Sequence, residues 1–141
     1  MNWRFRDRLD AGILLLRVGI GSMFVIIHGY PKLVGGVALW AGIGGAFNRL
    51  TGLNFVPVFW GFLAMLAEFG GGLCLIAGIF FRPACTAIFF TMLIAVISIL
   101  RGGYGFNAAS QPFELGIVAA ALCLTGPGRF TARQLLPQKK L

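Results

Sequence analysis

Two ionisable side chains lie inside long apolar runs of this 141-residue chain. Arg17 falls near the middle of the first run, and Glu68 lies almost at the middle of the second. A charge at the centre of a lipid bilayer costs roughly 3 kcal/mol or more, so such a residue is a functional candidate. Pairing is the least costly way to keep both groups ionised. The sequence therefore predicts a core polar pair of Arg17 and Glu68, which either forms a polar site or only fixes the register of two antiparallel helices.

Four further ionisable residues are expected at one level, near the outer ends of the helices. His28 lies close to the end of the first run, Glu114 lies near the start of the last, and Lys32 and Arg101 fall at the same depth. A histidine, a carboxylate and two cations can bind an anionic or quinone-like headgroup and move protons, because imidazole titrates near neutral pH. We name these four residues the outer polar mouth. The alternative is an interfacial belt solvated by water and lipid headgroups.

Several specific kinds of metal and redox site are excluded, because the chain lacks the residues that they need. A haem held by two histidines is excluded because the chain has one, and no set of residues has the spacing of a tetrahedral metal site. The three cysteines, Cys74, Cys85 and Cys123, form no C-x-x-C pair and lie in or beside apolar runs. The sequence therefore predicts no metal site, and it predicts cysteines that act as small apolar residues.

The elements that must position these residues are membrane-spanning helices. Hydrophobic residues make up 58% of the chain and charged residues 11%, which lies outside the range of soluble domains. The predicted fold class is all-α: one integral membrane four-helix bundle over residues 1–141, with a longer first extracytoplasmic loop. A span needs about 20 residues, and we expect spans over 11–30, with Pro31 as its stop, and over 56–81, 84–100 and 112–125. Residues 35–55 are expected either to lie at the outer interface, covering the mouth of the bundle, or to form an ordinary loop.

The formal charge of +8 points to membrane anchoring rather than to nucleic acid. A nucleic-acid surface needs cations clustered on one solvated face, whereas these are scattered between apolar runs. With four spans, Lys32, Arg49 and Arg101 lie on one side of the membrane. The other side carries the larger set, which places both termini in the cytoplasm by the positive-inside rule: Arg4, Arg6, Arg8, Arg82, Arg129, Arg133, Lys139 and Lys140.

Helical periodicity gives each predicted span one face of small or polar residues. Small faces let helix backbones approach closely in lipid, so we expect these faces to meet in the interior of the bundle. From the first predicted span to the fourth, the residues of these faces are Arg17, Gly21, Phe24 and His28; Gly61, Ala64, Glu68, Gly71 and Gly72; Ala84, Ala87, Thr91, Ala95 and Ser98; and Glu114, Ala121 and Thr125.

The segments that carry these residues resemble the DoxX family of small bacterial inner-membrane proteins. The similarity covers most of the chain and is least defined over residues 35–55. Its segments are LRVGIGSMFVIIHGYPKL (Leu16–Leu33), LAEFGGGLCLIAGIFFRPA (Leu66–Ala84), FELGIV (Phe113–Val118) and GPGRFT (Gly126–Thr131). The positions that match the family pattern include Arg17, His28, Gly29, Lys32, Glu68, Glu114 and the Gly126-Pro127-Gly128 turn. The resemblance implies a multi-pass protein of the bacterial inner membrane.

The resemblance also implies a link to redox metabolism. DoxX-like proteins are associated with the membrane subunit of a thiosulfate:quinone oxidoreductase and with assemblies that link thiol or sulfur metabolism to oxidative-stress defence. We therefore expect a membrane-embedded component of a redox system without a redox centre of its own, at most a non-autonomous subunit, with a quinone as candidate cofactor and a partner protein in the membrane. The alternatives are an assembly module for a partner protein and a small-solute or proton pathway. The sequence leaves the substrate, the partner and the oligomeric state open.

Overall fold

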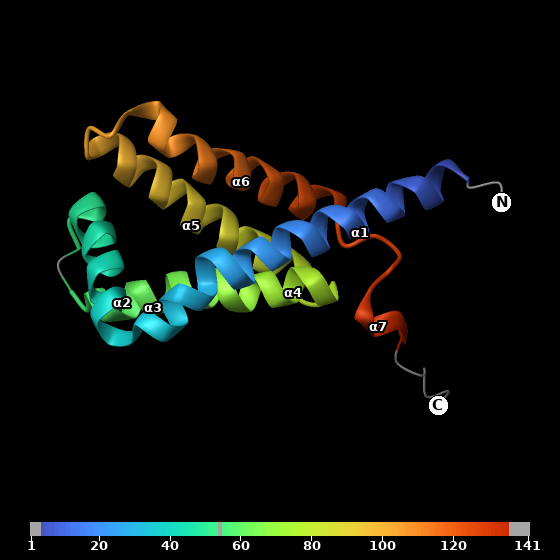
Figure 1. Cartoon of the computed structure of the whole chain (residues 1–141), viewed down its shortest axis with the longest axis horizontal. Helices are drawn as coiled ribbons and strands as arrows, with labels where there is room; N and C mark the ends of the chain where they lie inside the picture. Colours follow the sequence, from blue (N-terminus) through green and yellow to red (C-terminus); the bar gives the residue numbers. More distant parts are fainter. Residues whose placement is uncertain (1–3, 54, 136–141) are drawn as a thin grey trace.

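Long antiparallel helices form the body of the molecule in a computed structural model, which describes residues 4–53 and 55–135. Four helical stretches in this part of the chain are long and apolar enough to cross a membrane, which confirms the predicted all-α membrane bundle. The amino and carboxyl termini lie at the same end of the bundle (Figure 1). We call this end the terminal end and the opposite one the α2 end.

The first helix is longer and more bent than the sequence predicted. α1 (Phe5–Met23) continues through a π-helical turn, η1 (Phe24–Gly29), into α2 (Tyr30–Thr51). Pro31 does not end it, because this residue follows the wide η1 turn and occupies the start of α2, where a missing N–H is tolerated. The chain bends instead at Gly36, whose φ of 58° and ψ of −152° are open essentially to glycine alone.

Beyond this bend, α2 crosses the α2 end of the bundle and adds no further span (Figure 1). It packs along α3 (Pro57–Met65), and a side chain on Gly61 would collide with the backbone of Trp40. Of the two predictions made for residues 35–55, the structure agrees with a segment that covers the mouth of the bundle. That segment is a helix.

The second and third spans meet at a tight turn. α3 runs through a second π-helical turn, η2 (Leu66–Gly70), into α4 (Gly71–Ala77). This helix ends at Gly78, which adopts a left-handed conformation with φ 69°. α5 (Phe81–Arg101) then begins with a residue that the sequence assigned to the second span. The predicted boundary was wrong because a glycine C-cap ends the helix before the apolar run is finished.

The fourth span, α6 (Gly105–Thr125), starts at residue 105 rather than at 112 and has 21 residues. Pro112 lies inside it, which membrane helices tolerate because neighbouring groups and local adjustments satisfy the freed carbonyl. Glu114 therefore lies about 14 Å along the helix from its first residue, at a rise of about 1.5 Å per residue. The sequence placed Glu114 at the outer end of the helix, and this prediction was wrong. A short helix, α7 (Ala132–Leu135), follows the closing turn.

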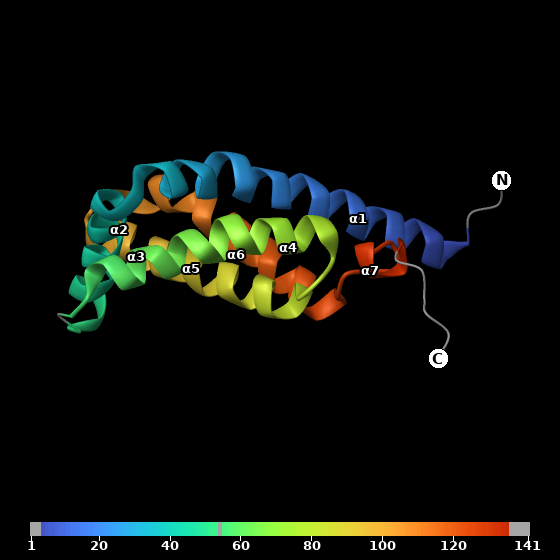
Figure 2. The same ribbon diagram turned by 90° about the horizontal axis from the view of Figure 1, so that it is seen from below.

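Besides the α2–α3 pair, the helices pack in two pairs, α1 with α4 and α5 with α6 (Figure 2). The buried apolar core lies where these four helices meet, in the half of the bundle nearer the terminal end. It consists of Phe24, Leu75, Phe81, Ala84, Cys85, Ile88, Met92, Ala119 and Leu122.

The contact between the first and second spans is a close backbone crossing. A Cβ atom on Gly21 would lie 2.8 Å from the carbonyl oxygen of Gly72, and a Cβ on Gly29 would lie 2.6 Å from the backbone of Phe69. The prediction that the small faces of these two spans meet is therefore confirmed at Gly21 and Gly72, whereas the predicted faces did not include Gly29 and Phe69. Because the backbones touch at two levels, the crossing fixes which residues of the two spans face each other.

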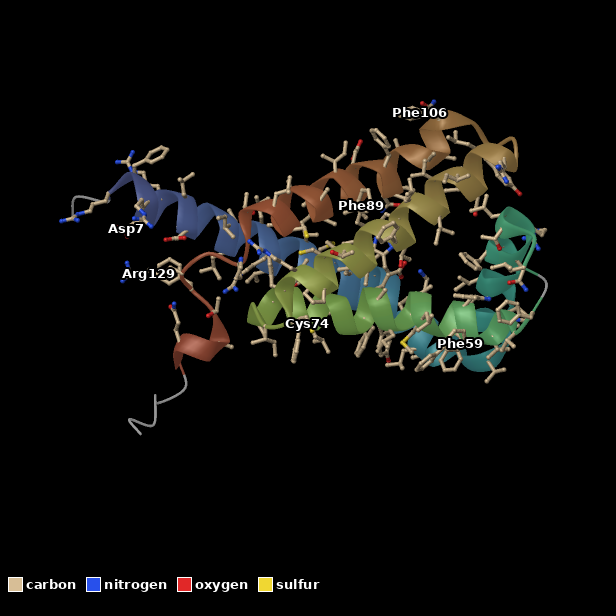
Figure 3. The ribbon with its side chains drawn as sticks, turned by 180° about the vertical axis from the view of Figure 1, so that it is seen from behind. Asp7, Phe59, Cys74, Phe89, Phe106 and Arg129 are labelled. Atoms are coloured by element: carbon tan, nitrogen blue, oxygen red, sulfur yellow. The ribbon has the colours of Figure 1, made fainter. Side chains whose placement is uncertain are left out.

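At the terminal end, polar contacts join the start of α1 to the turn that follows α6. The backbone N–H of Arg129 donates to Asp10 Oδ1 at 3.1 Å, and its guanidinium Nη1 lies 3.3 Å from Asp7 Oδ1 (Figure 3). These contacts hold the turn after α6 against the start of α1. The placement of this end in the cytoplasm stays a prediction from charge.

Candidate functional site

Glu68 and Lys32 form an ion pair inside the bundle. Glu68 is 1% exposed, and Lys32 Nζ donates to its Oε2 atom. Lys32 lies in the first turn of α2, beyond Pro31, and its side chain is 22% exposed. Trp40 donates from Nε1 to the carbonyl oxygen of Lys32 at 2.8 Å, so the part of α2 after the bend folds back over the pair.

Arg17 does not pair with Glu68, and this sequence prediction was wrong. Its guanidinium lies against Gly78 at the terminal end of α4, which is about 15 Å along the helix from Glu68 at a rise of about 1.5 Å per residue. The cause is the length of the first span: it continues past Pro31, so the crossing places Lys32 opposite Glu68. Arg17 is 2% exposed, and its Nε and Nη1 atoms have no hydrogen-bond partner within residues 4–53 and 55–135.

The four residues of the outer polar mouth do not converge. Lys32 forms an ion pair with Glu68. Arg101 is exposed and donates from Nη1 to the carbonyl oxygen of Leu50 at 3.2 Å. Glu114 is exposed on α6, away from its predicted level. His28 is half-buried one turn before Lys32. Of the predicted set, His28 and Lys32 lie beside the segment that carries Glu68.

Both wide helical turns of the described chain lie at this place. η1 carries His28, η2 carries Glu68, and the two turns contact each other. Isolated π-helical turns are rare in helices and are frequent at functional sites. The close approach of Gly29 to Phe69 lies at this contact. The site is therefore built on two adjacent irregular turns.

A cavity of about 770 Å³ lies between the second span and α5, with the ion pair in its wall. This volume is within the range of small-molecule sites, about 300–1,000 Å³. Ile43 and Phe47 of α2 line it at the α2 end. Leu63, Leu66 and Phe80 line it and are also exposed on the surface of the bundle. The cavity is therefore open toward the side that lipid would cover.

The small face of α5 borders this cavity rather than a neighbouring helix. Ala87, Thr91, Ala95 and Ser98 all line the open space. The sequence predicted that this face would meet the other small faces closely, and over this stretch the prediction was wrong. The physical reason is the second half of α2, which contacts both α3 and α5 at the α2 end and occupies the place where those helices would otherwise meet.

The sequence did not single out two polar residues that line the cavity. Trp60 Nε1 and Ser98 Oγ are buried without a hydrogen-bond partner in the described part of the chain, and both residues line the cavity. Ser98 appeared only as part of a small face. Trp60 precedes Ala64 and Glu68 by one and two helical steps of four residues, so periodicity was the signal that could have found it.

The cysteines and acidic groups offer no metal centre in the residues described. Within 4–53 and 55–135, no group of three His, Cys, Asp or Glu side chains lies close enough together to hold a metal ion. Cys74, Cys85 and Cys123 are free thiols. Cys74 lines the cavity, whereas Cys85 belongs to the buried core.

The DoxX family model matches residues 12–101, which include Arg17, His28, Lys32 and Glu68. The chain belongs to the DoxX family. Inner membrane protein YqjF of Escherichia coli (strain K12) is 32% identical over 135 residues, which cover 92% of this chain and 95% of YqjF. No solved structure gave a significant match. With its four spanning stretches, this DoxX protein is a multi-pass inner-membrane protein.

Proposed function

We propose that this DoxX protein is the membrane-embedded component of a quinone-linked redox system. In this proposal the cavity holds a quinone or a similar amphiphile, and a partner protein supplies the electrons. The observation that carries the proposal is the apolar cavity of about 770 Å³ with the Lys32–Glu68 ion pair in its wall.

The shape and the lining of the cavity suit a long apolar molecule. On α5 its lining residues extend from Pro83 to Ile99, which is about 24 Å of helix at a rise of about 1.5 Å per residue. Alanine, leucine and isoleucine side chains make up much of the wall. An isoprenoid or acyl chain already dissolved in the bilayer can enter through the lateral opening beside Leu63 and Leu66.

The polar groups of the site suit proton exchange with a neutral headgroup. Reduction of a quinone to a quinol takes up two electrons and two protons. Glu68, Lys32 and His28 lie on adjoining turns and are all groups that can accept or release a proton. Ionisable groups inside the membrane are typical of proton relays. The site would therefore supply protons, whereas the electrons would come from the partner.

The test is the quinone content of the protein purified natively from membranes. We expect near-stoichiometric quinone with the wild type and its loss from Ala95→Phe, which fills the cavity from the α5 wall. The matched control is Ala121→Phe, because Ala121 is exposed on α6 and lies outside the cavity lining. Equal quinone in the wild type and Ala95→Phe would contradict the proposal. Wild-type protein that retains a partner but no quinone would contradict it too, and would favour an assembly module.

A further inference from the structure

Glu114 is exposed on the outer side of α6, within the membrane-spanning stretch. α6 lies at the edge of the bundle, where it packs along α5 and touches α1 (Figure 1). Glu114 precedes the buried Gly116 by two residues, which is about 200° around the helix, so its side chain points away from the bundle. The described residues form two ion pairs, and Glu114 belongs to neither of them.

This carboxylate lies near the middle of the membrane. At a rise of about 1.5 Å per residue, Glu114 is about 14 Å from the first residue of α6 and about 16 Å from the last. The neighbouring Gly116 packs against Met92, which lies in the middle of α5. The hydrocarbon core of a bilayer is about 30 Å thick, and a glutamate side chain is too short to reach either surface. Ionisable groups at such a depth almost always face a bundle interior or pair with another group.

Polar and small residues continue along the same side of α6. Asn107 and Gln111 precede Glu114 by seven and three residues, and Ala121 and Thr125 follow it by seven and eleven, so the five residues share one side of the helix. All five are exposed, and we name them the α6 stripe. The sequence predicted that Glu114, Ala121 and Thr125 would face the interior of the bundle. That prediction was wrong, because the opposite side of α6 also carries small residues and packs against α5 instead.

We propose that the α6 stripe is the docking surface for a membrane-spanning helix of a partner protein, and that this helix carries a Lys or Arg side chain that pairs with Glu114. The pairing offsets the cost of a carboxylate in lipid. The side-chain amides of Asn107 and Gln111 can hydrogen-bond to the same helix, and the small side chain of Ala121 lets it approach closely. The inference rests on the proposed function only in that the redox system has a partner protein. It adds where that partner binds and which charge it brings.

A second copy of this chain does not fit the α6 stripe. Two α6 helices that met along their stripes would place two Glu114 carboxylates in one interface, where like charges repel each other. No other face of the described chain supplies the cation. Its exposed arginine side chains all lie in the first or last turn of a helix or outside the helices. Arg17 is buried and Lys32 is paired with Glu68, so the cation comes from another protein.

The test is photocrosslinking from the α6 stripe in native membranes. p-Benzoylphenylalanine in place of Ala121 leaves Glu114 intact and points away from the bundle. We expect a covalent adduct with another membrane protein. The attached peptide, identified by mass spectrometry, should lie in a spanning helix that has a Lys or Arg residue near its middle.

The matched control carries the same photoreactive residue in place of Leu73, which is exposed on α4 and lies outside the cavity lining. Leu73 and Ala121 lie at similar depth, because Gly71 faces Ile88 of α5 and Cys123 contacts the same turn of that helix. We expect the control to form adducts with lipid. Equal yields of the same protein adduct from the two positions would overturn the docking surface.

Changing the charge at position 114 tests the pairing itself. Glu114→Gln should lower the adduct yield from position 121 about fivefold, within the range of polar contacts between membrane helices. Glu114→Lys should abolish the adduct, and replacing the partner's basic residue with glutamate should restore at least about half of the original yield. An adduct yield that Glu114→Gln leaves unchanged would overturn the proposal. So would adducts with lipid alone, with a second copy of this chain, or with a helix that has no basic residue near its middle.

The quinone content of the same membranes separates this proposal from the proposed function. A charge-dependent protein adduct from a wild type without bound quinone would refute the quinone function and leave the docking surface standing. Bound quinone together with adducts to lipid alone would refute the docking surface and leave the quinone site standing.

Discussion

The second span has two sides that carry the same kind of residue and meet different surroundings. On one side, Gly72 and Phe69 touch the backbone of the first span at Gly21 and Gly29. On the other side, Ala64, Ala67 and Gly70 line the cavity opposite the small residues of α5. The first contact is closed by backbone atoms, and the second is open.

This difference shows that a face of small residues allows close packing but does not cause it. Two helices with small faces approach until something else prevents it. Between the first and second spans nothing intervenes. Between α3 and α5, the part of α2 after Gly36 occupies the α2 end, where Arg101 joins α5 to Leu50 at the end of α2. A third element therefore turns one of two similar contacts into a cavity.

Substitution in the closed contact should have the largest effect. Gly29→Ala places a methyl group 2.6 Å from the backbone of Phe69, which cannot move as a flexible side chain can. We expect a loss of about 3 kcal/mol, at the upper end for overpacking, measured by denaturant titration in detergent micelles. Gly19→Ala is the control, because a Cβ there has no neighbour within 4 Å. Similar losses in the two variants would mean that the crossing is not closed by backbone contact.

Breaking the ion pair should have the next largest effect. Lys32→Met leaves Glu68 buried without its partner, and we expect a loss of about 2 kcal/mol, reduced from the usual value because Lys32 is partly solvated. Combining it with Glu68→Met should recover part of that loss. A double-mutant cycle over Arg17→Met and Glu68→Met should be additive within about 0.5 kcal/mol. Coupling of Glu68 to Arg17 rather than to Lys32 would restore the pairing that the sequence predicted.

Substitution on the open side should have the smallest effect. A Cβ on Gly70, which lines the cavity, would lie 3.3 Å from the end of the Leu66 side chain, and that side chain is exposed and can move. We expect Gly70→Ala to change stability by less than about 1 kcal/mol, because the better helix propensity of alanine offsets the small shift that the methyl group causes. A loss as large as that of Gly29→Ala would show that this side of the second span is packed as tightly as its contact with the first span.

The sequence predicted the fold class, the span number and the close contact of the first two spans, because apolar length and helical periodicity determine them. It did not predict the partner of Glu68, because a proline after an apolar run is typical of a helix end, whereas here the helix continues through Pro31 to Lys32. Had the helical stripe that contains His28 been extended by four residues, it would have reached Lys32. The bend at Gly36 has no such signal, because a glycine in an apolar run is compatible with a straight helix as well as with a bend.

The sequence also did not predict the cavity, for a different reason. Its walls carry the small residues that the periodicity placed correctly on α5, but an empty space between two faces depends on a third element. Pro112 similarly favoured a late start for α6, whereas a membrane helix accommodates it. Local patterns therefore identified the faces, and the order of the helices in space decided what each face meets.

The reactivity of single cysteines tests most directly whether the second span has one open and one closed side. Cys74 lines the cavity, and Cys85 is 0% exposed in the core. In two variants that each keep one of these cysteines, a membrane-permeant maleimide should label Cys74 at least about ten times faster than Cys85, whose reaction needs local opening of the helices. Adding Ala87→Phe on the facing wall of α5 should slow the labelling of Cys74. Equal rates for the two cysteines, or a Cys74 rate that Ala87→Phe leaves unchanged, would contradict the open cavity.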